Sequence, residues 1–158
     1  MDGSSLKKQS RLPLCESTGF LMRDTHLTVA RVLRSRLQGA RITLSQWYFL
    51  RAMWSEEGLS QRELASRVGI TEPSTLSALR KLEKNGFVRK VRNARDRRAN
   101  TLYLTEAGQN LEGELIHHAV EVNSNATRGF SDDELATLHD YLRRIKTNLM
   151  DEISKDKG

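Results

Sequence analysis

The chain has 158 residues, 37% of them hydrophobic and 29% charged, with a net charge of +6, so it can bury the core of one ordinary domain with additional helices. No apolar run approaches the ~18 residues that a membrane span needs, and the basic start lacks the apolar segment of a signal peptide, so we expect a cytoplasmic protein with no membrane partner. The single cysteine, Cys15, excludes an intrachain disulfide framework and a cysteine-based zinc site.

The first part of the chain predicts an arm followed by two helices. Residues 1–17 are mostly polar and show no periodicity, which is typical of a flexible N-terminal arm. Apolar residues then recur at helical spacing from Phe20 until Gly39 ends the pattern. Ser45 is the expected N-cap of the second helix, and Gly58 is its expected end.

Two shorter helices follow in quick succession. Ser60 and Glu63 form a capping box, and Gly69 ends the helix after about ten residues. Thr71 is the expected N-cap of the next helix, which runs to Asn85. The spacing predicts a helix-turn-helix.

The remaining segments predict a hairpin and two long helices. Residues 87–92 and 100–105 read as two strands on either side of a charged turn, NARDRRAN. A long helix begins at Thr105 or Glu106, and SDDE at 131–134 caps the last helix, which carries an apolar stripe of Leu135, Leu138, Leu142, Ile145, Leu149 and Ile153. The stripe is too long for a small domain to cover by itself, which indicates a dimer.

The positive charge is concentrated in one segment, residues 80–98. Nine Lys or Arg residues stand there against Glu83 and Asp96, giving +7, so the remaining residues sum to −1. A solvated basic face would explain the composition, but the concentration favours a polyanionic partner.

The helix that starts after Thr71 has two different sides. Leu76, Leu79 and Leu82 share one side. The other side is small near the N-terminus and cationic further along, and it consists of Ser74, Ser77, Arg80, Lys81 and Lys84. Hydroxyl groups at a helix N-terminus suit base edges in the major groove, and cations suit phosphates. An ordinary amphipathic helix with a solvated face is the alternative.

The hairpin tip suits the other groove of DNA. Guanidinium groups are attracted to the negative potential of the narrow minor groove, and Arg95, Arg97 and Arg98 supply three of them. Asp96 is expected to pair with a neighbouring Arg and to fix the turn.

Three stretches together are similar to the MarR family of bacterial winged helix-turn-helix regulators. They are LSQWYFL at 44–50, LSQRELASRVGITEPSTLSALRKLEKNGFVRK at 59–90 and RDRRANTLYLTEAG at 95–108, and the resemblance covers about residues 18–153. It implies a mainly α (α+β) fold in which residues 41–105 form the winged helix-turn-helix, and residues 18–40 and 106–155 form the helical dimerisation region. It also implies a nucleoid-associated homodimer that binds a pseudo-palindromic, double-stranded DNA operator and usually represses transcription.

The resemblance also implies roles for particular residues. Asp96 and Arg98 match the wing's aspartate and its minor-groove arginine, while Arg95 and Arg97 are expected at phosphates or in solvent. Four residues match the base-reading start of the recognition helix: Pro73, Ser74, Thr75 and Ser77. Many relatives have Arg where this chain has Ser77, so the operator sequence cannot be transferred.

A ligand site between the first, second and fifth helices is implied in the same way. Its candidate residues are Phe20, Arg23, His26, Trp47, Phe49, Met53 and His118. They suit a small aromatic carboxylate or its thioester, whose anion would meet Arg23 or His26. Alternatively, these residues are simply core and surface of a helical dimer.

Other functions have weaker support. Redox control through Cys15 is one alternative, although Gly19 occupies the place where some relatives carry a sensing cysteine. Zinc binding would need more than the pair Glu114 and His118. No phosphate loop, nucleophile elbow or catalytic triad is present, so we expect neither an enzyme nor a cofactor. A non-specific architectural DNA-binding protein would share the basic segment and remains open.

Overall fold

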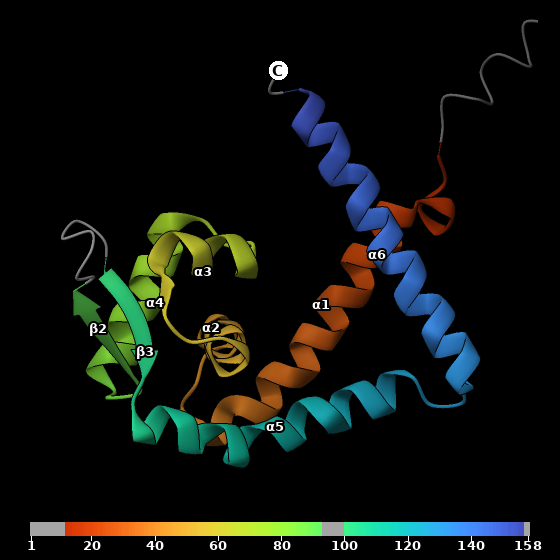
Figure 1. Cartoon of the computed structure of the whole chain (residues 1–158). Helices are drawn as coiled ribbons and strands as arrows, with labels where there is room; N and C mark the ends of the chain where they lie inside the picture. The colour runs from red at the N-terminus through yellow and green to blue at the C-terminus, as the bar shows by residue number, and fades with distance from the viewer. Residues whose placement is uncertain (1–11, 93–99, 157–158) are drawn as a thin grey trace, which may run out of the picture. The chain divides into compact units, whose positions relative to one another are not determined.

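The computed structural model describes residues 12–92 and 100–156 (Figure 1). The chain divides into two compact units, residues 1–122 and residues 123–158, which are described separately. The helices of the first unit are α1 (Thr18–Leu37), α2 (Leu44–Ser55), α3 (Gln61–Val68), α4 (Glu72–Lys84) and α5 (Glu106–Ala126), whose last turn passes into the second unit. Short 3-10 helices at Leu14–Glu16 and Gln38–Ala40 flank α1.

A small antiparallel sheet accompanies the helix-turn-helix. Its strands are β1 (Leu59–Ser60), β2 (Val88–Arg92) and β3 (Asn100–Leu104), in the order β1-β3-β2. Both β1 and β2 pair with β3: Leu59 lies opposite Leu102, and Val88 lies opposite Leu104. The hairpin predicted from the sequence is confirmed, but β1 was not predicted, because two residues carry too little pattern to be recognised as a strand.

The helix starts follow local hydrogen bonding. Ser60 accepts from the Glu63 backbone N–H at 3.2 Å, and the Glu63 carboxylate accepts from the Ser60 N–H at 2.7 Å, so the predicted capping box is present. The prediction that Ser45 caps the second helix is wrong. Thr43 does so, and it forms a capping box with Gln46.

The core of the first unit lies where α2, α3 and α4 meet the sheet. Its fully enclosed side chains include Phe49, Leu50, Met53, Leu64, Leu79, Leu82 and Leu102. Leu111, Leu115 and Val122 extend the same cluster along α5, and Leu33 and Leu37 extend it along α1. This packing fixes one side of α4 inside the protein and leaves its other side in solvent.

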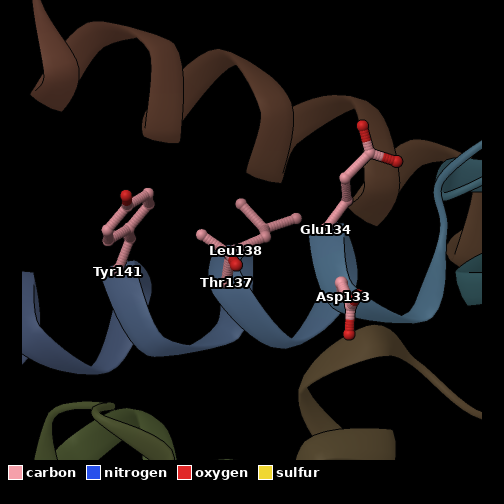
Figure 2. A pocket seen from close by; sticks show the side chains of 5 residues that line it. All are labelled: Asp133, Glu134, Thr137, Leu138 and Tyr141. Carbon is pink, nitrogen blue, oxygen red and sulfur yellow. The ribbon is translucent and has the colours of Figure 1, made fainter.

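The second unit consists of the end of α5 and the long helix α6 (Asp132–Lys155). The predicted capping box is present, because Ser131 accepts from the Glu134 N–H and the Glu134 carboxylate accepts from the Ser131 N–H. No residue of α6 is buried, although Tyr141, Leu142, Leu149, Met150 and Ile153 are large and apolar. A shallow hollow of about 310 Å³ lies along this helix, and Figure 2 shows Glu134, Leu138 and Tyr141 extending from one side of it.

None of the helices within residues 12–92 and 100–156 is long and apolar enough to span a membrane. A mainly helical chain with one small antiparallel sheet agrees with the fold class that the sequence predicts.

Candidate nucleic-acid interface

Helix α4 presents two chemically different sides. Its inner side packs into the core through Ala78, Leu79 and Leu82. Its exposed residues are the acidic Glu72 at its first position and then Pro73, Ser74, Ser77, Arg80, Lys81 and Lys84. The exposed side is therefore small and hydroxylated near the N-terminus and cationic in the second half, as the helical wheel predicts.

Thr75 does not belong to the exposed side. Its side chain is fully buried, and its hydroxyl donates to the Thr71 carbonyl at 3.0 Å, a bond within the first turn of the helix. The prediction that Thr75 reads DNA is therefore wrong for this structure, since a buried and hydrogen-bonded hydroxyl cannot reach a base edge. Leu76, placed inside by the wheel, is only half-buried.

A further basic side chain, that of Arg62 on α3, lies beside the turn between α3 and α4. A shallow hollow of about 470 Å³ opens there, lined by Arg62, Ala65, Ser66, Gly69, Ile70, Thr71 and Glu72. The Thr71 hydroxyl donates to Ser74 Oγ at 3.1 Å and makes no capping bond to α4. The sequence does not predict a role for Arg62, because it lies outside the basic segment and only the turn brings it beside the start of α4.

Two basic side chains of β2, the first strand of the wing, each contact a neighbouring side chain. Lys90 Nζ lies 2.7 Å from Glu83 Oε2, so the single acidic residue in the second half of α4 is paired with β2. The Arg89 guanidinium lies 5.1 Å from the centre of the Tyr103 ring on β3, within the range of a cation–π contact. The tip residues Arg95, Asp96, Arg97 and Arg98 lie outside the described residues.

The predicted ligand residues do not form one group. Trp47, Phe49 and Met53 are core side chains, 2% exposed or less, and the Trp47 ring meets the Trp54 ring edge-on at 5.5 Å. Their burial agrees with the alternative stated for the sequence, in which these three residues belong to the core. On α1, Phe20 is half-buried, and Arg23 and His26 are exposed.

His118 is the exception among these residues, because its surroundings perturb it. Its Nδ1 is buried without a hydrogen-bond partner, and its ring centre lies 3.9 Å from that of His117. Burial, and then the neighbouring His117, lower the pKa of His118 below its usual value of 6.5. Arg36 and Glu121, which form an ion pair at 3.4 Å, act on it in opposite directions.

Two of the alternatives from the sequence concern metal and redox chemistry. Within the described part of the chain, no three His, Cys, Asp or Glu side chains are placed to hold a metal ion. Cys15 is a free, exposed thiol in the 3-10 helix before α1.

Comparison with known proteins agrees with this geometry. The MarR family model matches residues 42–99, which span α2, the helix-turn-helix and the first strand of the wing. The HTH-type transcriptional regulator TtmR of Methylorubrum extorquens is 32% identical over 121 residues. The chain belongs to the MarR family. The Bacillus subtilis protein YybA, an uncharacterised HTH-type transcriptional regulator, is 28% identical over 114 residues. These relatives are regulators, not enzymes.

The relatives differ in how much of their length is matched. The TtmR match covers 75% of this chain but only 60% of TtmR, and the YybA match covers 68% of this chain and 72% of YybA. Solved MarR structures extend the likeness in fold over most of the chain. A MarR regulator from Methanosarcina mazei aligns with a TM-score of 0.79 at 24% identity, covering 84% of this chain and 96% of its own. BpsR of Bordetella bronchiseptica aligns with a TM-score of 0.78 at 18% identity, covering 87% and 98%.

Proposed function

We propose that this MarR-family chain is a homodimeric transcriptional regulator that binds a specific, pseudo-palindromic DNA operator and represses transcription. The observation that carries the proposal is the exposed side of α4. Ser74 and Ser77 stand at its N-terminal half, Arg80, Lys81 and Lys84 follow, and the opposite side is fixed in the core. Short hydroxyl side chains allow close approach to base edges, while the cations neutralise phosphates.

The wing supplies the second contact in this proposal. The ion pair between Lys90 and Glu83 offsets the one negative charge in the second half of α4, which would otherwise repel DNA there. From its place in the sequence, Arg98 enters the minor groove, and Asp96 shapes the tip. Residues 41–105 thus act as the DNA-binding region.

The helices outside that region supply the dimer. Tyr141, Leu142, Leu149, Met150 and Ile153 of α6 are each between 44% and 54% exposed, and α1 exposes Leu21, Leu27 and Val32. Apolar surface of this kind is unfavourable in water and is buried when a second copy packs against it. We assign residues 18–40 and 106–155 to this role, with residues 1–17 as an arm. A two-fold dimer places two α4 helices about one DNA turn apart.

A small aromatic carboxylate, or its thioester, is the proposed effector. BpsR, which shares the fold, is described as regulated in its DNA binding by 6-hydroxynicotinic acid, an aromatic acid. On this chain Arg23 and His26 are exposed cationic or protonatable groups of α1 that could meet such an anion. An effector of this kind lowers operator affinity only if it binds better to a form with a different spacing of the two α4 helices.

The experiment begins with selection of a binding site from a library of random DNA duplexes. We expect an enriched, two-fold symmetric sequence bound by two chains, as measured by analytical ultracentrifugation of the complex. Addition of aromatic acids, with 6-hydroxynicotinic acid among them, is expected to release the duplex. A library that yields no enriched sequence contradicts specific binding. If none of the aromatic acids shifts the melting temperature of the protein or releases the DNA, the result contradicts the proposed effector but not the proposed DNA binding.

A further inference from the structure

The base of the wing, where α4 ends and α5 begins, is closed by one side chain. Thr105 directly follows β3, and its backbone N–H donates to the Phe87 carbonyl at 3.0 Å. Its hydroxyl donates to the Gly86 carbonyl at 2.5 Å and accepts from the Gly108 N–H at 3.1 Å. The hydroxyl thus joins Gly86, which follows the end of α4, to the first turn of α5, and the backbone N–H of Thr105 holds Phe87, just before β2.

Gly108 brings α5 into direct contact with the wing. A Cβ at this position would lie 2.0 Å from the Phe87 carbonyl oxygen and 3.0 Å from its carbon. Both atoms are backbone, so neither can swing aside as the end of a side chain would. Glycine inside a helix costs about 1 kcal/mol relative to alanine. The helix itself would therefore favour Ala, and it is the contact with Phe87 that requires Gly.

The same junction is braced against the core of the helix-turn-helix. The Trp54 indole N–H, at the end of α2, donates to the Gly108 carbonyl at 2.9 Å. The Glu57 carboxylate accepts from the Leu104 N–H at 3.2 Å, at the last residue of β3. The base of the wing is thus held from both sides, by α5 and by the segment after α2.

We infer that Thr105 and Gly108 are positioning residues that set the angle between the wing and helix α4, and this inference rests on the proposed DNA binding. Strands rise ~3.3 Å per residue, so the five-residue strand β2 reaches about 16 Å from the junction. At that length, a tilt of about 10° at the base moves the tip by roughly 3 Å, a displacement comparable to a whole hydrogen bond. Correct placement of wing and helix in two grooves therefore depends on the junction, although neither residue contacts DNA.

The chain offers a matched pair of substitutions for the test. Gly108→Ala and Gly113→Ala make the same change in the same helix, but a Cβ at Gly113 meets nothing within 4 Å. Both variants are measured against the duplex selected by the wild-type protein and against random duplex at the same salt. We expect Gly108→Ala to lose about tenfold or more of its affinity for the selected duplex and little of its affinity for random DNA, while Gly113→Ala behaves as wild type.

A second pair keeps the test decisive if Gly108→Ala fails to fold. Thr105→Val keeps the shape of the side chain but removes both hydroxyl bonds, and Thr105→Ser keeps the hydroxyl. We expect Thr105→Val to lose specific affinity at temperatures where it is folded and dimeric, and Thr105→Ser to regain it. Folded variants that discriminate between selected and random DNA as well as wild type overturn the inference, as does an equal loss of both affinities. If the wild type selects no sequence, the proposed function itself fails, which is a separate and recognisable result.

Discussion

Lys90 on the first strand of the wing lies 2.7 Å from the carboxylate of Glu83 on α4, and both side chains are about a quarter to a third exposed. The pair joins the two elements that are proposed to enter the two grooves of DNA. It also explains why an acidic residue is tolerated in a helix face that is otherwise cationic.

We predict that this pair contributes to stability as a unit. Lys90→Met and Glu83→Gln each leave one partner unpaired, so the double variant is expected to lose less free energy of unfolding than the two single variants together. The coupling should be on the order of 0.5–1 kcal/mol, as for partly exposed ion pairs. Urea unfolding of the four proteins measures it, and strictly additive losses would show that the two charges do not interact.

Lys84 is predicted to act on phosphates, and therefore without sequence preference. Lys84→Ala should weaken binding to all duplexes alike and should reduce the slope of log affinity against log salt by about 1. Lys155→Ala removes an exposed cation at the far end of α6 and serves as the control. A loss confined to the selected duplex would instead assign Lys84 to base reading.

Arg98 is predicted to act in the minor groove. Arg98→Ala should weaken binding to the selected duplex by about 1–3 kcal/mol while the dimer survives. Arg97→Ala, at the neighbouring position, should have the smaller effect of a phosphate or solvent contact. Fluorescence anisotropy with labelled duplex measures both, and wild-type affinity in Arg98→Ala would end the minor-groove role.

The apolar side of α6 is predicted to hold the dimer together. Leu149→Asp places a charge on the exposed stripe, whereas Thr147→Asp places the same charge on the other side of the helix. A buried Leu contributes ~1.5–3 kcal/mol and a two-fold interface contains it twice, so the dimer dissociation constant should rise by roughly two to four orders of magnitude. Equal dimerisation of both variants in sedimentation equilibrium would place the interface elsewhere.

His118 is predicted to make stability depend on pH. Its pKa in the folded protein is lowered by burial and by His117, so the unfolded chain binds a proton more readily. Stability should therefore be complete above the usual pKa of 6.5 and should decline as pH falls below it. The Glu63 and Glu134 carboxylates affect stability at lower pH. Hydrogen bonds from Ser60 and Ser131 lower their pKa values, so the stability that they contribute is lost only as pH falls below 4.5.

The control for this prediction is another histidine. His118→Gln should flatten the decline between about pH 7 and pH 5, and His139→Gln, at an exposed position on α6, should leave it unchanged. Chemical unfolding at a series of pH values gives the free energies. The same decline in the His118 variant as in wild type would show that other groups cause it.

Features that depend on neighbours in the sequence could be predicted. The capping boxes at Ser60 and Ser131 are found where they were expected, because each needs only a hydroxyl residue and a Glu three positions later. Thr43 and Gln46 have the same spacing, so the true start of α2 was also visible in the sequence, and Ser45 was chosen wrongly.

Features that depend on distant contacts could not be predicted. The strand at Leu59 exists because Leu102, far along the chain, pairs with it. Thr75 is a different case: at about 100° per residue it falls between Leu79 and Leu82 on the helical wheel, so its burial could have been predicted from the spacing. Nothing in the sequence near Gly108 shows that Phe87 lies against it, so the junction at the base of the wing became apparent only from the structure.

The most direct test of the account is an equilibrium competition between the selected duplex and a shuffled duplex of the same length and composition, at the same salt. A specific regulator is expected to prefer the selected duplex by about 10³-fold or more, with one dimer bound per site. Equal affinity for the two duplexes would contradict specific recognition by α4 and the wing, and would leave a basic protein that binds DNA through its phosphates alone.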